Sequence, residues 1–173
     1  MFHNSLDINN VTELRLRTLV YFGCGAIRKI EEIAAALEKR GIGKLLVVTG
    51  RGAYKKTGAW DQIVPALAAH KIDYALFDKV TPNPTTTQID EAVALAKEAG
   101  AQAVLCIGGG SAIDAGKSAA ILLANPQYNA SDLYCYKFAP EHAVPIIAVN
   151  LTHGTGTEAD RVAVATIPES EYK

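Results

Sequence analysis

Short apolar runs alternate with amphipathic segments along most of the chain. The apolar runs that predict strands lie at residues 44–49, 74–77, 104–107 and 145–149. Apolar residues at helical spacing predict helices at residues 26–40, 58–70 and 86–97, and a further helix directly after residues 108–110. Such alternation of strands and helices is typical of parallel β-α-β units. The pattern therefore predicts one α/β domain over residues 1–173, a Rossmann-like parallel sheet with helices on both faces.

Less regular patterns cover the rest of the chain. Residues 14–22 alternate apolar and polar positions and then become continuously apolar, which predicts one N-terminal strand, and residues 161–167 predict another. Residues 126–140 are expected to form a loop. The sequence T-P-N-P-T at 81–85 predicts a rigid loop, because proline restricts both itself and the residue before it.

The strongest local signal is the run of three glycines at 108–110 between a strand and a helix. Glycine allows a sharp turn or a close approach to a ligand, and the helix start that follows can bind phosphate. Ser111 is expected to be the N-cap, with Asp114 completing a capping box and Lys117 pairing with Asp114. A nucleotide site and a purely structural turn both fit this pattern, which is not the G-x-G-x-x-G fingerprint.

Ligands of parallel sheets bind beyond the carboxyl ends of the strands. The turns predicted there are residues 50–52, 81–85, 108–111 and 152–157. We expect these turns to face one crevice.

Composition excludes several classes of function. Hydrophobic residues make up 49% of the chain and the net charge is −1, without the basic excess that nucleic-acid binding requires. No apolar run reaches the roughly 20 residues of a membrane span, and the N-terminus lacks a signal-peptide pattern, so a cytoplasmic protein is expected. Cys24, Cys106 and Cys135 predict neither a disulfide framework nor a zinc site and are expected to be small, partly buried hydrophobic residues.

Four motifs in order resemble those of the iron-containing (group III) alcohol dehydrogenase family. They are F-G-C-G-A at 22–26, V-T-P-N-P-T at 80–85, G-G-G-S-A-I-D-A-G-K at 108–117 and T-H-G-T-G-T-E at 152–158. The resemblance implies a dehydroquinate synthase-like N-terminal domain that binds a nicotinamide dinucleotide. The residues that it places at the cofactor are Asn83, Gly109, Gly110, Ser111, Asp114, Thr152 and Thr155, with Asp114 near the nicotinamide end.

One departure from the family bears on the cofactor. Members that use NAD carry an Asp after the second strand, which binds the ribose 2′-hydroxyl, whereas this chain has Gly50, followed by Arg51, Lys55 and Lys56. A missing carboxylate removes repulsion from a 2′-phosphate, and nearby cations attract it. NADP is therefore expected rather than NAD, with Gly50 at the cofactor; the alternative is that the three cations form a solvated loop.

The threonine loop also departs from the family, which commonly reads P-T-T-A-G-T-G-S-E-V-T where residues 150–160 read N-L-T-H-G-T-G-T-E-A-D. Leu151 and Asp160 replace hydroxyl residues and His153 replaces a small one. No cofactor contact is assigned to these three side chains, and His153 is expected to be an exposed loop residue rather than a catalytic group.

The family binds its catalytic metal, Fe²⁺ or Zn²⁺, through one Asp and three His on a helical C-terminal domain. The four histidines of this sequence, His3, His70, His142 and His153, show no metal-ligand spacing. We therefore assign no catalytic and no metal-binding residue and expect a truncated chain, inactive alone. In the complete enzyme the resemblance implies hydride exchange between the nicotinamide and a small primary alcohol or aldehyde, with the metal as Lewis acid.

Two other interpretations stay open. The related glycerol dehydrogenase and dehydroquinate synthase group resembles this fold and glycine turn. A non-catalytic assembly domain is the other. An N-terminal strand at a sheet edge invites pairing with a second subunit, and the resembled family is commonly dimeric, so a homodimer is expected.

Overall fold

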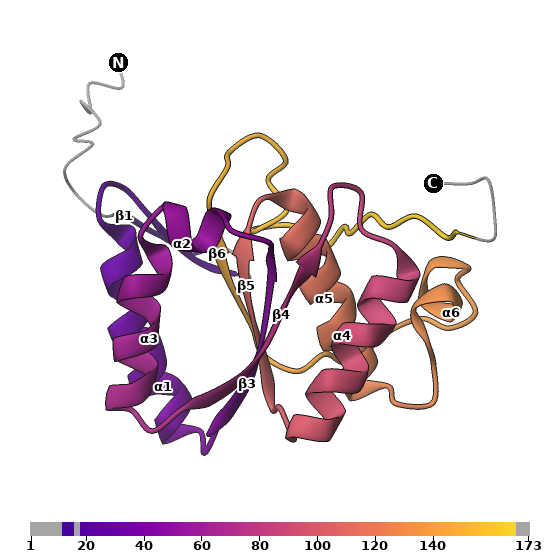
Figure 1. Ribbon diagram of the computed structural model, residues 1–173, viewed down its shortest axis with the longest axis horizontal. Helices are drawn as coiled ribbons and strands as arrows, with labels where there is room; N and C mark the ends of the chain where they lie inside the picture. The colour runs from indigo at the N-terminus through magenta and orange to yellow at the C-terminus, as the bar shows by residue number, and fades with distance from the viewer. Residues whose placement is uncertain (1–11, 16–17, 169–173) are drawn as a thin grey trace.

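The computed structural model describes residues 12–15 and 18–168 (Figure 1). Its centre is a sheet of four parallel strands in the order β4-β3-β5-β6. These strands are β3 (Lys44–Gly50), β4 (Asp73–Val80), β5 (Ala103–Gly108) and β6 (Ile146–Asn150). Strand β5 is buried at every residue, as expected of a strand with neighbours on both sides and helices on both faces. The predicted α/β parallel sheet is therefore confirmed.

Helices cover both faces of the sheet (Figure 1). Helices α1 (Ile30–Lys39) and α3 (Ala59–Ala69) lie on one face, and α4 (Thr86–Ala99) and α5 (Gly110–Ala124) on the other. Alternate residues of β3 serve the two cores: Leu45 and Val47 pack with α1 and α3, whereas Leu46 and Val48 pack with α4 and α5. The strand sequences are apolar throughout because both of their faces are buried.

Shorter elements complete the fold. The 3₁₀ helix η1 (Ala26–Lys29) leads into α1, and α2 (Ala53–Lys56) precedes α3. Residues 126–140 are not wholly a loop, because they contain α6 (Ala130–Tyr134), which begins at a capping box between Asn129 and Asp132. No helix in the described part of the chain is long and apolar enough to span a membrane.

The prediction of one strand over residues 14–22 was wrong. The chain instead forms an antiparallel hairpin of β1 (Thr12–Arg15) and β2 (Leu19–Phe22), in which Thr12 pairs with Phe22. The alternating pattern is the same for one long strand and for two hairpin arms, and no Gly or Pro marks the reversal. The hairpin is a separate two-stranded sheet, so β2 is not an edge strand of the central sheet.

The prediction of a strand over residues 161–167 was also wrong. Only a single bridge forms, in which Thr86 N donates to Thr166 O and Thr166 N donates to Pro84 O. The backbone N–H groups of Val162 and Val164 donate to aspartate side chains rather than to a neighbouring strand. These two backbone donors therefore have hydrogen-bond acceptors without pairing to a neighbouring strand.

His70, just past the end of α3, ties that helix to α1. Its Nδ1 lies 2.7 Å from Glu38 Oε2, and its Nε2 lies 3.1 Å from Glu31 Oε1. The hydrogen bond with Glu38 raises the pKa of His70 above its ordinary value, and Glu31 acts in the same direction. A pKa raised by folding means that the protonated form stabilises the native state.

We therefore expect the contribution of His70 to stability to be fully present below about pH 6.5 and to be lost as the pH rises through the raised pKa. Thermal melts of the parent and of His70→Gln across this range measure the effect. The exposed His142, changed to Gln, is the control. Melting temperatures of the parent and of His70→Gln that follow the same pH profile would contradict the assignment.

Candidate functional site

A cleft of about 610 Å³ opens at the carboxyl ends of the central strands. Such a volume is in the range of sites for small molecules and cofactors. All four predicted turns contribute to its wall, which confirms that they face one crevice. Their lining residues are Gly50, Arg51, Thr81, Pro82, Gly108, Gly109, Gly110, Ser111 and Thr152.

Two glycines of the cleft allow the threonine loop to approach closely. A Cβ on Gly109 would lie 2.5 Å from Thr152 Oγ1, and a Cβ on Gly110 would lie 3.1 Å from Thr155 Cγ2. Helix α5 begins at Gly110, so its N-terminal backbone N–H groups and the positive end of its dipole lie at the cleft. The arrangement suits an anion such as a phosphate.

The predicted capping of α5 was wrong. The N-cap is Gly109 and no side chain caps the helix, so Ser111 is the second helical residue and Asp114 the fifth. From those positions the reciprocal bonds of a capping box do not form. The carboxylate of Asp114 instead accepts hydrogen bonds from Thr157 Oγ1 at 2.5 Å and from Val164 N at 3.1 Å. The predicted pairing with Lys117 is confirmed at 4.0 Å.

The residues that the sequence placed at the cofactor divide into two groups. Those that line the cleft are Gly50, Gly109, Gly110, Ser111 and Thr152. Those that do not line it are Asn83, Asp114 and Thr155. Asn83 is exposed beside Pro82 with a left-handed backbone (φ 55°), and Thr155 reaches the cleft only through its contact with Gly110.

The charge of the cleft is positive. Among the described residues that line it, Arg51 is the only charged one, and none is Asp or Glu. Lys55 and Lys56 are exposed on α2 outside the lining, with Lys55 Nζ 5.3 Å from the centre of the Tyr54 ring. Arg51, rather than Lys55 or Lys56, is therefore the cation placed to pair with an anionic group bound next to Gly50.

Gln88 is a site-building residue that the sequence analysis missed. Its Oε1 accepts from Thr81 Oγ1 at 3.2 Å and from Thr85 N at 3.4 Å, which fixes the loop that carries Thr81 into the cleft. Gln88 is also the third residue of α4 and completes a capping box with Thr85. The T-x-x-Q spacing at 85–88 was a readable signal for it.

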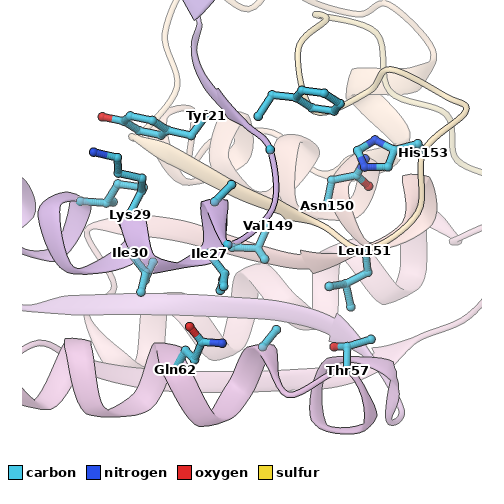
Figure 2. Close-up of a pocket in the computed structure, with 16 residues that line it drawn as sticks. Tyr21, Ile27, Lys29, Ile30, Thr57, Gln62, Val149, Asn150, Leu151 and His153 are labelled. Atoms are coloured by element: carbon cyan, nitrogen blue, oxygen red, sulfur yellow. The ribbon is translucent and has the colours of Figure 1, made fainter. Parts of the chain in front are cut away.

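A second cavity, of about 330 Å³, lies beside the β2 and η1 segment, and residues of the threonine loop (150–160) form part of its wall (Figure 2). Leu151 and His153 line this cavity, whereas Thr152 between them lines the cleft. The His153 ring is exposed, as expected, and stands edge-on to Phe22 at 5.8 Å. The departures from the family at Leu151 and His153 therefore lie outside the cleft.

One of the three cysteines is buried and two are exposed. Cys106 is fully buried on β5, and burial raises the pKa of its thiol to about 12, which keeps it protonated. Cys24 and Cys135 are exposed, so the expectation that they are partly buried was wrong for these two. Cys24 lies in the turn between two glycines, and Cys135 is the C-cap of α6.

The described residues do not fit a catalytic metal. Across 12–15 and 18–168 no group of three or more His, Cys, Asp and Glu side chains could hold a metal ion. Among those residues His70 is already paired with two glutamates, and His153 lies beside a phenylalanine ring. A nicotinamide dinucleotide does fit, because the glycine turn and the uncompensated Arg51 suit its phosphates.

Known proteins match this chain over most of its length. Residues 18–173 match the family described as iron-containing alcohol dehydrogenase. The long-chain primary alcohol dehydrogenase AdhA of Thermoanaerobacter ethanolicus is 54% identical over 173 residues, which are 100% of this chain and 43% of the relative.

Solved structures agree with these matches. The NADH-dependent butanol dehydrogenase A of Thermotoga maritima superposes with a TM-score of 0.77 at 37% identity, covering 85% of this chain and 36% of that one. The sulfoacetaldehyde reductase of Bifidobacterium kashiwanohense, solved in complex with NAD⁺, superposes with a TM-score of 0.74 at 28% identity, covering 85% and 38%.

The chain thus spans less than half the length of these relatives. The family match extends from β2 to the C-terminus and includes every turn of the cleft. The structural matches are to the N-terminal part of the iron-containing enzymes, as the resemblance implied. This chain belongs to the iron-containing alcohol dehydrogenase family of oxidoreductases.

Proposed function

We propose that this chain is the nicotinamide cofactor-binding domain of a metal-dependent alcohol dehydrogenase and that it prefers NADP(H). The observation that carries the proposal is the cleft, which joins a glycine turn at the start of α5 to Gly50 and Arg51 and has no acidic side chain among the described residues of its lining. A relative of similar fold was solved with NAD⁺. The bound nicotinamide would supply the hydride acceptor or donor.

The residues of the cleft have separate proposed roles. Gly109, Gly110 and Ser111 would bind the pyrophosphate through the start of α5, with Thr152 and Thr155 packed over them. Asn83 would contact the cofactor from the exposed end of the T-P-N-P-T loop.

The preference for NADP(H) rests on residues 50 and 51 of this chain. One relative is named NADH-dependent and another was solved with NAD⁺. In this chain Gly50 leaves room and no negative charge where a ribose 2′-phosphate would lie, and Arg51 is a partner for it.

The rest of the reaction is proposed for the longer protein. A primary alcohol or aldehyde would be the substrate, in keeping with the name of the Thermoanaerobacter relative. The metal, Fe²⁺ or Zn²⁺, would be held by residues outside this chain, and this chain alone would turn over no alcohol. A homodimer and a cytoplasmic location stay predictions.

Nucleotide-dependent thermal stabilisation tests the proposal. At 100 times its Kd, NADPH should stabilise the chain by about 2.7 kcal/mol and raise Tm by about 5–10 °C. A non-catalytic assembly domain, the second candidate function, would show no shift with either NADPH or NADH. Alcohol oxidation by the chain alone with NADP⁺ and added Fe²⁺ would contradict the proposal that the metal ligands lie elsewhere.

A further inference from the structure

Lys117, on α5, pairs with Asp114 and donates hydrogen bonds to oxygen atoms of one segment, residues 157–162. Its Nζ donates to Thr157 O at 2.8 Å, to Asp160 Oδ1 at 2.9 Å and to Asp160 O at 3.3 Å, and it also donates to Val162 O. The lysine side chain is only 12% exposed. An ammonium group has three donors and no acceptor, so this shell occupies it fully.

Asp114, one turn earlier on the same helix, binds the same segment with the opposite chemistry. Its two oxygens accept from the Thr157 hydroxyl and from the backbone N–H of Val164, and its side chain is 14% exposed. Lys117 therefore binds acceptors of the segment, three carbonyl groups and one carboxylate, and Asp114 binds donors of the segment. The segment is held to α5 between residues 157 and 164 although it forms no strand there.

The segment continues directly from the threonine loop. Residues 152–156 are exposed and belong to no helix or strand, whereas Thr157 is only 4% exposed. Thr157 N also donates to Thr155 Oγ1 at 3.4 Å, and Thr155 lies against Gly110. Anchoring Thr157 therefore restricts the exposed loop that covers the glycine turn, because a loop fixed at both ends has fewer conformations.

We propose that Asp114 and Lys117 are positioning residues that hold residues 157–164 on α5 and so keep Thr152 and Thr155 over Gly109 and Gly110. Asp114 then acts on the cofactor site through Thr157 rather than by touching the nicotinamide. The part of this inference that concerns ligand binding rests on the proposed cofactor function. The anchoring itself does not.

The anchoring is tested by cleavage after Arg161, an exposed residue inside the held segment. An arginine-specific protease is used, so that lysine substitutions remove no cleavage site. Cleavage follows the fraction of open segment, and Lys117→Met should accelerate it by at least about tenfold, leaving cleavage after Arg51 unchanged. Lys137→Met is the matched control, because Lys137 pairs with Asp132 and does not touch the segment.

Thr157→Val is the second variant, which removes the hydroxyl donor to Asp114 while keeping the shape of the side chain. Circular dichroism and Tm identify any variant that fails to fold. If Lys117→Met is folded, its rate of cleavage after Arg161 tests the anchoring. If Lys117→Met is not folded, the rate measured for Thr157→Val tests it instead. Cleavage after Arg161 at the parental rate in the folded variant would overturn the anchoring.

The link to the cofactor site is tested with two ligands, NADPH and 2′-phosphoadenosine 5′-diphosphoribose, which keeps the pyrophosphate but lacks nicotinamide. If only the closed fraction binds, Lys117→Met and Asp114→Asn should weaken both ligands by the same factor, which reaches about tenfold when the segment is open in about nine-tenths of the molecules, and Lys137→Met should weaken neither. A loss confined to NADPH, or no loss in a variant whose cleavage rate shows that the segment is open in most molecules, would overturn the link. A parent chain that binds neither ligand nor NADH would overturn the proposed function, while the cleavage result would still decide the anchoring.

Discussion

Replacing Gly50 by Asp is expected to weaken NADPH binding by about 100-fold, with much less effect on NADH. The new carboxylate would stand in the cleft next to Arg51, where the 2′-phosphate of NADPH is proposed to bind. It would repel that phosphate and pair with Arg51, whereas it could accept a hydrogen bond from the 2′-hydroxyl of NADH. A Cβ at this position would lie 3.3 Å from Val80 O, which requires only a small adjustment. Fluorescence titration with each nucleotide measures both affinities.

Gly52→Asp is the matched control for this variant. It adds the same charge in the same turn, but Gly52 does not line the cleft and a Cβ there would meet nothing within 4 Å. Gly52 is also the N-cap of α2, where Asp is favourable. Equal losses of NADPH affinity in the two variants would mean that general charge repulsion, and not the position of Gly50, governs the choice of cofactor.

Replacing Gly116 by Ala is expected to lower the free energy of unfolding by about 2 kcal/mol. A Cβ on Gly116 would lie 2.1 Å from Cys106 Sγ and 3.4 Å from Cys106 Cβ, both of them inside the core between α5 and β5. The higher helix propensity of Ala stabilises the helix by about 1 kcal/mol, which offsets only part of the destabilisation caused by overpacking. The midpoint of urea denaturation measures the net loss.

The double variant Gly116→Ala with Cys106→Ala identifies the cause. Removing the sulfur atom makes room for the new methyl group, so the double variant should be less destabilised than the sum of the two single variants. Strictly additive losses would show that the contact between Gly116 and Cys106 is not what requires glycine at this position.

The central sheet could be predicted from the sequence because its strands are buried on both faces. Residues 44–49 and 104–107 are continuously apolar, and each run ends at a glycine where the chain turns over the edge of the sheet. The hairpin of β1 and β2 could not be predicted, because apolar and polar residues alternate in two hairpin arms in the same way as in a single strand. The course of residues 161–167 depends on Asp114 and Thr166, whose partners lie far away in the sequence.

Of the candidate site, too, the sequence predicts the features that have a local signal and not those that depend on distant partners. The glycine turn and Thr152 line the cleft, and their position at one crevice could be predicted because glycines and strand ends are local signals. The capping role of Asp114 was predicted wrongly, because the N-cap lies two residues earlier than expected, at Gly109 instead of Ser111, which changes the backbone groups that the acid can reach. Its actual partners, Thr157 and Val164, lie 43 and 50 residues away and leave no trace in the local pattern.

The central claim is that the cleft binds a nicotinamide dinucleotide and selects the one with a 2′-phosphate. Its most direct test is a paired titration of the same preparation with NADPH and NADH, followed by the fluorescence of the nucleotide. We predict that NADPH binds more tightly by about tenfold or more, as expected for one charged contact to a phosphate. Equal or tighter binding of NADH would contradict the role assigned to Gly50 and Arg51, and no binding of either would contradict the cofactor site itself.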